Sequence, residues 1–505
     1  AGTDGGDTIT GRAGNDVLRG GAGGDTIGGG TGDDDLDGGA GGDDYTFEDG
    51  FGTDTVNDSG TSGVDRLLFG SVTTALTGTT AFGESTVTTA NGEVRYPTSV
   101  IEQIVGGSGD DTFSFQNQES GGFQFDGGDG SDVINVQTST NSRTITITDS
   151  GANGTDTLNI AGTTGADKML LRSSSTGLNQ TATAGFAARL STNTAGSVVS
   201  TDRYDYDNTI ETLNVDGGFG ADEFTLDDNA TSTNIIGGEG DDTVQVGQIY
   251  GLADCGNGSA TATCPGGDTE SARTAAVGVG AGEAYATAVI TRGHLSNGVT
   301  NPLVINGDGG NDTITVFSNK AEVTANGGAD DDKFVARAFI VTASLTLNGE
   351  GGVDDFNYVV NSQIAVDGGS GVDTFTVIGT EANDGFIVDS SGGNPTLQTC
   401  PVVNGRPDPT SPNCALNSNV QNVEVFAVQG LEGDDVFWIR SSVAGSLIEM
   451  SGGPDSDVFL IGDGTLDSID GPLQVAGDNF GSIPSIPNPV VLAGEDTTPA
   501  FDPAA

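Results

Sequence analysis

The sequence of 505 residues is poor in basic side chains and in long apolar runs. It has 16 Lys plus Arg against 72 Asp plus Glu, which gives a formal net charge of -56. Such an acidic chain repels phosphate backbones and anionic lipid head groups, so we expect no nucleic-acid partner. No stretch reaches the roughly 18 consecutive apolar residues of a transmembrane helix, so we expect no direct membrane insertion. The charge favours cations as partners.

The sequence also lacks the usual catalytic constellations. His294 is the single histidine, and it lies in the loop-like segment TRGHLSNG. No GxSxG, HExxH or Walker motif occurs. Carboxylates are too frequent for any pair to indicate glycoside hydrolysis, and sparse Lys and Arg argue against a polysaccharide lyase. We therefore predict that these residues hold no enzyme active site.

Cysteine is scarce, and its four copies form two close pairs, Cys255 with Cys264 and Cys400 with Cys414. Each pair lies in a segment rich in Gly, Pro, Ser and Asn. Paired cysteines in such loops favour local disulfides and an oxidising, extracellular compartment. A zinc site would need Cys or His ligands at tighter spacing. We predict two disulfides in a secreted or cell-surface protein.

Glycine and aspartate are abundant and form a repeat. Glycine supplies 84 residues, well above its ordinary share of about 7%. Near the N-terminus an aspartate recurs every nine residues, and an Ile, Leu or Tyr follows two positions after each one. These aspartates are Asp7, Asp16, Asp25, Asp34 and Asp43. Repeats of this kind are typical of solenoids.

Beyond residue 100 the same glycine turn returns at wider intervals, 19 to 22 residues apart within clusters. The aspartates that end these turns are Asp111, Asp132, Asp222, Asp242, Asp312, Asp332, Asp354, Asp373, Asp435 and Asp457. A second strand-like segment lies between most turns, for example FQF after Phe115 and TNII before Gly237. No short turn signal indicates antiparallel pairing. We predict an all-β fold, a right-handed parallel β-roll or β-solenoid with 18-residue coils at the N-terminus and rungs of about 20 residues afterwards.

Two pairs of similar segments, far apart in the sequence, suggest an internal duplication. The segment from Asp156 resembles the one from Asp373, and IETLNV from Ile210 resembles VEVFAV from Val423. We predict a β-roll with cap at 1–74, a first super-repeat with a loop insertion at 75–300, a second at 301–480 and a Pro-rich tail or linker at 481–505. One continuous solenoid with two phases is the alternative.

The turns need a cation on physical grounds. Stacked rungs would place equivalent carboxylates about 4.8 Å apart, where they repel by roughly 3 to 4 kcal/mol at an effective dielectric near 20. Each nonapeptide buries one large apolar residue, worth roughly 1.5 to 3 kcal/mol, against a backbone entropy cost of about 1 to 2 kcal/mol for every residue. Carboxylate and carbonyl oxygens in a flexible cage favour Ca²⁺ over Mg²⁺. We expect several Ca²⁺ ions and folding that depends on them. For the long rungs, a solvated acidic turn is the alternative.

The units GRAGNDVLR (11–19), GGAGGDTIG (20–28), GGTGDDDLD (29–37) and GGAGGDDYT (38–46) resemble the RTX, or haemolysin-type, calcium-binding nonapeptide. The resemblance implies that two nonapeptides make one coil, with calcium between turns 18 residues apart. It also implies backbone ligands at Gly21, Gly23, Gly30, Gly32, Gly39 and Gly41. Three departures from the motif are Arg12 and Asp330, each in place of a glycine, and Pro454, which interrupts the turn before Asp457.

We expect from these features an extracellular calcium-binding β-solenoid with a structural or adhesive role, in a surface layer, filament or matrix. Copies could join end to end, and other surface proteins or glycans are further candidate partners. The alternative is the non-catalytic, calcium-binding and secretion-linked region of a larger secreted toxin, protease or polysaccharide-modifying enzyme. Among the aromatic residues, we expect Tyr204 and Tyr206 to pack along a rung edge and Trp438 to face outward.

Overall fold

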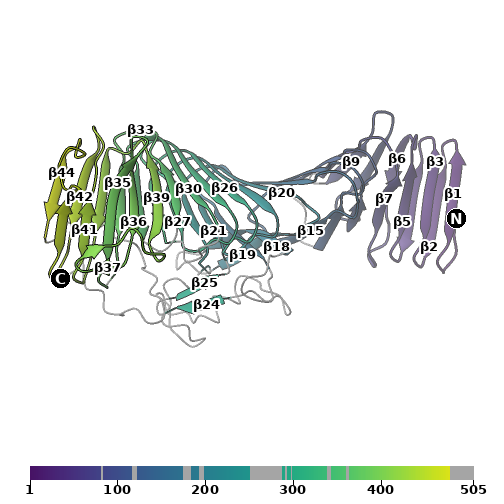
Figure 1. Cartoon of the computed structure of the whole chain (residues 1–505). Helices are drawn as coiled ribbons and strands as arrows, with labels where there is room; N and C mark the ends of the chain where they lie inside the picture. Colours follow the sequence, from purple (N-terminus) through teal and green to yellow (C-terminus); the bar gives the residue numbers. More distant parts are fainter. Residues whose placement is uncertain are drawn as a thin grey trace.

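The computed structural model describes residues 1–80, 83–116, 122–173, 183–192, 198–248, 250, 287–290, 293–296, 298–337, 343–359, 363–380 and 382–477. Over these residues the regular secondary structure consists of β-strands, which form an elongated stack with β1 at one end and β44 at the other (Figure 1). In this part of the chain, no helix has the length and apolar character needed to cross a bilayer. The predicted parallel β-solenoid is confirmed.

Most rungs place one strand in each of two long sheets. The 19-stranded sheet, here the first sheet, contains β1 (Thr8–Ala13), β3 (Thr26–Thr31), β5 (Asp44–Glu48), β7 (Arg66–Ser71), β11 (Gln103–Val105), β13 (Gly122–Asp126), β15 (Arg143–Thr148), β17 (Lys168–Ser173), β18 (Ala184–Thr192), β19 (Val198–Asp207), β21 (Glu223–Leu226), β23 (Thr243–Val246), β27 (Thr313–Val316), β29 (Lys333–Ala336), β31 (Asp355–Val359), β34 (Thr374–Ile378), β40 (Val425–Gln429), β42 (Leu447–Ser451) and β44 (Leu473–Ala476).

The second sheet faces the first across the core. It contains β2 (Val17–Ala22), β4 (Asp35–Ala40), β6 (Thr53–Val56), β8 (Thr77–Thr80), β9 (Glu84–Thr88), β10 (Glu93–Pro97), β12 (Thr112–Phe115), β14 (Val133–Gln137), β16 (Thr157–Ala161), β20 (Thr212–Phe219), β22 (Ser232–Glu239), β26 (Leu303–Gly309), β28 (Val323–Ala329), β30 (Leu345–Gly352), β32 (Ile364–Asp367), β33 (Ser370–Gly371), β35 (Gly385–Ser391), β36 (Asn394–Thr399), β39 (Ala415–Gln421), β41 (Val436–Ile439) and β43 (Val458–Ile461). Two small sheets flank the stack, β24 (Thr287–Ile290) with β25 (Gly293–Ser296), and β37 (Val402–Val403) with β38 (Arg406–Pro407).

Neighbouring rungs pair in register, so like residues stack on like. In the N-terminal coils Ile9 lies beside Ile27, one 18-residue coil later. In the long rungs Phe334 lies beside Phe356, and their rings stack with centroids 4.6 Å apart. The side chains alternate along each strand, so one apolar row from each sheet fills the space between the sheets. The core is therefore a narrow column that runs the length of the stack.

Three antiparallel strands interrupt the otherwise parallel stack, and the expectation of parallel pairing alone is wrong at these places. β9 pairs antiparallel with β8 and β10, β18 with β17 and β19, and β36 with β35 and β39. The sequence carries the hairpin signal Asn91-Gly92 between β9 and β10, and Gly392-Gly393 between β35 and β36. Both residues of the second pair have positive φ, at 63° and 90°. Each interruption inserts two additional strands between successive rungs.

The two sheets cross the predicted boundary near residue 300 without a break, since β22 pairs with β26 and β23 with β27. The division into two super-repeats stays a prediction. His294 lies in β25, so the expectation that it lies in a loop is wrong. The tail 481–505 and the pair Cys255 and Cys264 lie outside the described residues.

Replacing a core aromatic should destabilise the whole column. For Phe356→Ala we expect a loss of about 3 to 5 kcal/mol in the free energy of unfolding, because stacking and burial are both removed. Urea unfolding in calcium buffer, followed by circular dichroism, measures it. Val353→Ala is the matched control, since Val353 is 54% exposed. This substitution should change the free energy of unfolding by no more than about 0.5 kcal/mol. Equal losses for the two variants would contradict the predicted role of the column.

Candidate metal centre

Most glycine turns adopt one conformation along the stack; the turn that ends at Asp111 departs from it, because Gly107 and Gly109 do not have positive φ. If the motif GGxGxD is numbered from 1 to 6, positions 2 and 4 have positive φ, as in Gly21 (121°) and Gly23 (116°). A methyl group on Gly21 would lie 2.4 Å from the carbonyl oxygen of Thr3 in the preceding rung. Glycine is needed there both for the left-handed backbone and for the close approach of the next turn.

Non-glycine residues take the same left-handed conformation in other turns. They are Arg12, Asp308, Asp330, Glu350, Leu431 and Asp455, with φ between 69° and 87°, and each occupies position 2 or 4. An L-residue pays about 1 to 3 kcal/mol for such a backbone, so the neighbouring rungs must impose it. Pro454 does not interrupt its turn, because Gly453 and Asp455 on either side keep positive φ. The turn geometry is therefore set by stacking as well as by glycine.

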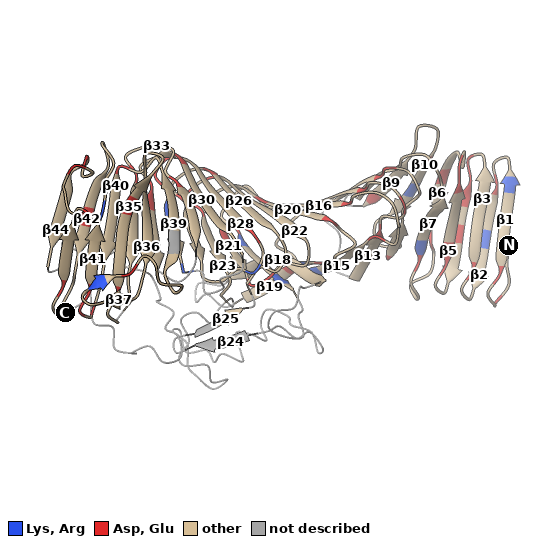
Figure 2. Cartoon of the chain, in the orientation of Figure 1, with Lys and Arg blue, Asp and Glu red and all other residues tan. Residues whose placement is uncertain are grey.

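The aspartates at position 6 form ladders between rungs. One carboxylate oxygen, Oδ1, accepts a hydrogen bond from the backbone N–H of the ladder aspartate one rung earlier, at 2.6 to 3.0 Å. The accepting residues are Asp25, Asp34, Asp43, Asp54, Asp65, Asp132, Asp156, Asp222, Asp242, Asp312, Asp332, Asp354, Asp373, Asp435 and Asp457. These bonds hold the carboxylates at the turns, where Figure 2 shows the acidic residues.

The second carboxylate oxygen, Oδ2, is buried and has no hydrogen-bond partner in many of these turns. The residues are Asp16, Asp25, Asp34, Asp43, Asp54, Asp132, Asp222, Asp242, Asp312, Asp332, Asp354, Asp373 and Asp435. A buried acceptor without a partner is costly, and a buried charge without one is more so. A buried carboxylate oxygen without a hydrogen-bond partner therefore recurs along the stack.

In many of these turns a backbone carbonyl oxygen faces the same space as the Oδ2 atom. A methyl group on Gly20, at position 1, would lie 2.2 Å from Asp25 Oδ2 and 2.3 Å from the carbonyl oxygen of Gly38 in the next rung. The same pair of oxygens faces Gly307, at 2.0 Å from Asp312 Oδ2 and 2.2 Å from the Gly327 oxygen. Carboxylate and carbonyl oxygens are the donors that Ca²⁺ uses in proteins. The residues present fit a calcium ion in the turns of the N-terminal coils and in the turns of the long rungs.

Burial raises the pKa of many ladder aspartates. The pKa of Asp132, Asp312, Asp332 and Asp435 rises to about 7, because burial disfavours the charged form. The carboxylate of the neighbouring rung raises it further, and the backbone N–H that donates to Oδ1 offsets part of the rise. Near neutral pH the ladder therefore has to take up either protons or a cation.

Three ladders begin where threonine replaces the glycine at position 2. Thr3, Thr163 and Thr380 donate their backbone N–H and hydroxyl groups to the carboxylates of Asp7, Asp167 and Asp384. The N–H of Gly107 similarly donates to Asp111 Oδ2 at 2.9 Å. In these first turns the protein itself supplies a partner for the aspartate. Asp7 and Asp111, both predicted ligands, therefore differ from the interior aspartates.

Ladders end where glutamate replaces aspartate. The N–H of Asp65 donates to Glu102 at 2.9 Å, that of Asp156 to Glu211 at 2.7 Å and that of Asp373 to Glu424 at 2.8 Å. A buried Ile or Val precedes each glutamate. Each of these glutamates follows one of the three antiparallel strands in the sequence. Glu102 lies directly before β11, Glu211 directly before β20 and Glu424 directly before β40. The interruptions and the ladder ends thus coincide.

The sequence analysis missed several ladder members. Asp54, Asp65, Asp156, Asp167 and Asp384 occupy the same place as the predicted residues. Most of their turns keep a glycine at position 1 but lack the one at position 2, as in GANGTD and GTTGAD. The recurring glycine five residues before an aspartate that starts an apolar strand was the available signal.

Two aromatic expectations need revision. Tyr204 and Tyr206 are 1% and 3% exposed and lie in the main core rather than along a rung edge. Trp438 points away from that core, but it is only 6% exposed because Arg406 covers it, with the guanidinium 3.9 Å from the ring centroid. It offers no free aromatic surface.

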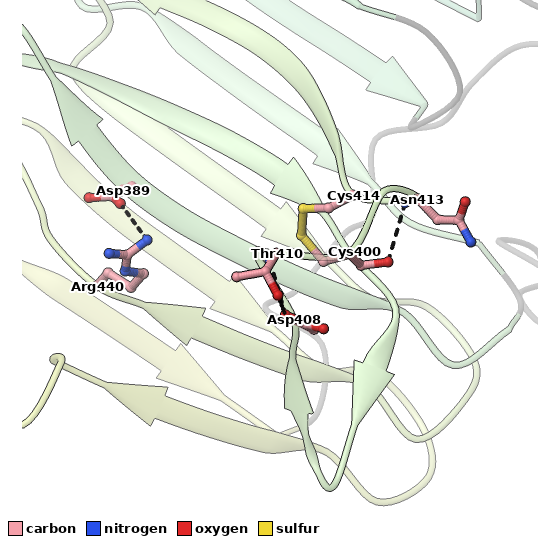
Figure 3. The surroundings of a disulfide bond; sticks show 8 residues. Asp389, Cys400, Asp408, Thr410, Asn413, Cys414 and Arg440 are labelled. Carbon is pink, nitrogen blue, oxygen red and sulfur yellow. Dashed lines mark hydrogen bonds and ion pairs between the residues drawn. A yellow bond between two sulfur atoms is a disulfide. The ribbon is translucent and has the colours of Figure 1, made fainter.

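The covering loop contains the Cys400–Cys414 disulfide, which the structure forms as expected from the spacing (Figure 3). Cys400 packs with Ile387 and Trp438 in a small cluster on the outside of the second sheet. Arg440 lies beside the same ring and pairs with Asp389 at 3.2 Å. The disulfide thus fastens a loop over an apolar patch of the sheet.

The comparisons with known proteins agree with this geometry. The family model for the RTX calcium-binding nonapeptide repeat matches the chain in four copies, at residues 1–36 and 304–316. The chain therefore carries RTX calcium-binding repeats, as the resemblance implied. The second matched segment contains Asp312 and lies in the long rungs, so the repeat is not confined to the N-terminal run. No curated protein matches the chain.

Acidification should stabilise the calcium-free protein. The folded-state pKa of Asp132, Asp312 and Asp332 is raised to about 7 from an ordinary value of 3.8, so the folded state binds more protons between these two pH values. Stability should therefore rise as the pH falls from 8 toward 5, and the β signal in circular dichroism of the protein in calcium-depleted buffer measures it.

The double variant Asp312→Asn/Asp332→Asn should flatten this pH dependence. The control Asp241→Asn/Asp331→Asn changes the same charge at exposed turn positions and should not. A β signal that falls on acidification without calcium would contradict the prediction.

Proposed function

We propose that the protein is an extracellular calcium-binding β-solenoid with a structural or adhesive role, folded and stiffened by several Ca²⁺ ions. The observation that carries this proposal is the row of buried Oδ2 atoms without a protein partner, many of which face a carbonyl oxygen. Ca²⁺ would bind the unpartnered Oδ2 of each turn and link two rungs. Binding would then contribute directly to folding.

The outer face of the second sheet supports a stiff, elongated role. Asparagine side chains stack from rung to rung there, with the Nδ2 of Asn159 bonded to Asn135 Oδ1 at 2.9 Å and that of Asn214 bonded to Asn159 at 2.7 Å. A second row joins Asn306, Asn326 and Asn348. Such in-register amide ladders add hydrogen bonds along the stack axis. They resist sliding of one rung past another.

An extracellular setting accords with the chemistry of the site. The Cys400–Cys414 disulfide favours an oxidising compartment. Calcium-binding modules outside cells commonly have dissociation constants of about 10⁻⁴ to 10⁻³ M. We propose that the chain folds where calcium is abundant and stays unfolded where it is scarce. Among the described strands, β1 and β44 at the two ends each pair with one neighbour, which supports end-to-end contact between copies.

Calcium should convert an expanded chain into a compact, β-rich one. We expect circular dichroism and size-exclusion chromatography to report both changes over the same calcium range, and EGTA to reverse them. Magnesium at equal ionic strength is the control for simple screening. Full β signal and unchanged hydrodynamic size in EGTA would refute the proposal.

Asp34→Asn should shift the calcium midpoint upward. Asp34 is buried and Oδ2 lacks a partner, whereas the adjacent Asp33 is exposed. Asp33→Asn removes the same charge one residue away and serves as the matched control. Identical midpoints for the two variants would show that net charge, rather than a ligand at position 6, sets the calcium dependence.

A further inference from the structure

Two turns carry an additional aspartate that the other turns lack. The segments DSGTSGVD (58–65) and DSGANGTD (149–156) share the pattern DSGxxGxD. In both, an aspartate stands seven residues before the ladder aspartate. In other turns a buried apolar residue occupies that position, as Leu18 does before Asp25. The RTX motif does not include this acidic position.

The second segment builds a cluster of three buried carboxylates. Asp132, Asp149 and Asp156 are 1%, 6% and 2% exposed, and one oxygen of each lies within 4.8 Å of the others. Asp149 Oδ1 and Asp132 Oδ2 have no hydrogen-bond partner. A methyl group on Gly127 would lie 3.0 Å from the first and 2.5 Å from the second. The two unpartnered oxygens therefore face the same small space from different rungs.

The first segment builds the equivalent cluster from Asp43, Asp58 and Asp65, all buried and within the same mutual distance. Asp43 Oδ2 has no hydrogen-bond partner. The hydroxyl of Tyr45 donates to Asp58 Oδ2 at 2.7 Å and accepts from the Gly38 N–H at 2.6 Å. Tyr45 thereby fixes Asp58 beside the ladder.

Both clusters occupy the last aspartate turn before a ladder-ending glutamate. Asp65 donates its N–H to Glu102, and Asp156 donates its N–H to Glu211. The ion pairs among the described residues engage other acidic side chains, so no Lys or Arg neutralises either cluster there. Three carboxylates gather at each place where an ordinary turn has two neighbouring aspartates. In the described part of the chain, these are the two places where three carboxylates converge within 4.8 Å of one another.

We propose that Asp43, Asp58 and Asp65, and likewise Asp132, Asp149 and Asp156, form three-carboxylate calcium sites that bind the ion more tightly than the ordinary turns. This inference rests on the proposed calcium-dependent function. The affinity of an oxygen-ligand site for Ca²⁺ rises with the number of charged ligands and with rigidity. The two sites fill first as calcium rises, so they order the ends of two ladders before the other turns bind.

Calorimetric titration of the full chain with Ca²⁺ tests the proposal. Asp149→Asn and Asp58→Asn should each weaken one tight site by about tenfold or more, and the double variant should lose both tight sites. Asp129→Asn is the matched control, because Asp129 is exposed in a neighbouring turn and accepts a hydrogen bond from Ala152 that Asn can keep. Asp129→Asn should leave the number and affinity of the tight calcium sites unchanged.

Terbium luminescence gives a second reading that leaves all carboxylates in place. Tb³⁺ replaces Ca²⁺ at oxygen sites and emits when a nearby tyrosine is excited. Tyr45 touches Asp58, so Tyr45→Phe should lower the tyrosine-sensitised emission of the first equivalents of Tb³⁺. Tyr96→Phe removes another buried tyrosine and is the control. Unchanged early emission in Tyr45→Phe would overturn the assignment of the first cluster.

The outcomes separate this inference from the proposed function. A chain that binds no calcium would overturn both. Calcium-dependent folding of the wild type with an unchanged tight class in Asp58→Asn and Asp149→Asn would overturn the three-carboxylate sites alone. Loss of one tight site in each single variant, with an unchanged Asp129→Asn control, would support them.

Discussion

The structure depends on the division of work between the two oxygens of each ladder aspartate. Oδ1 accepts the backbone N–H of the preceding rung, which fixes the side chain at the turn and contributes to the register of the sheets. Because that oxygen is engaged, the carboxylate cannot turn toward solvent, and in most interior turns Oδ2 stays buried, often in a space shared with a carbonyl oxygen. A proton or a cation must then neutralise the group. The proposed role of calcium thus follows from the way the rungs stack.

The ends of the ladders show what the interior turns are missing. At the first turns, threonine donors such as Thr163 and Thr380 contact the aspartate directly. At the last turns, Glu102, Glu211 and Glu424 accept the final N–H. Between these limits, the protein leaves Oδ2 without a donor. Most ladders therefore have ends at which the protein supplies the hydrogen-bond partners, and interiors in which Oδ2 lacks one.

Additional strands and loops fasten the stack where the ladders change. Each antiparallel strand adds pairing between rungs, and the hairpin of β18 and β19 carries a small apolar cluster outside the main core. The disulfide loop does the same over Trp438 on the second sheet. These elements add burial that the small residues of the nonapeptide coils do not provide.

The sequence alone determined the rung. The spacing of Asp25 and Asp43, with Ile27 and Tyr45 two residues later, is enough to predict parallel strands, the turn and the coil length, because a solenoid repeats one local unit. The tertiary structure decided what depends on neighbouring rungs. Leu431 and Asp455 adopt left-handed backbones that their own propensities disfavour, and Asp54 and Asp167 join ladders although their turns lack the motif. Asp58 and Asp149 meet carboxylates from other rungs only after stacking, since contacts between rungs arise from register and not from local sequence.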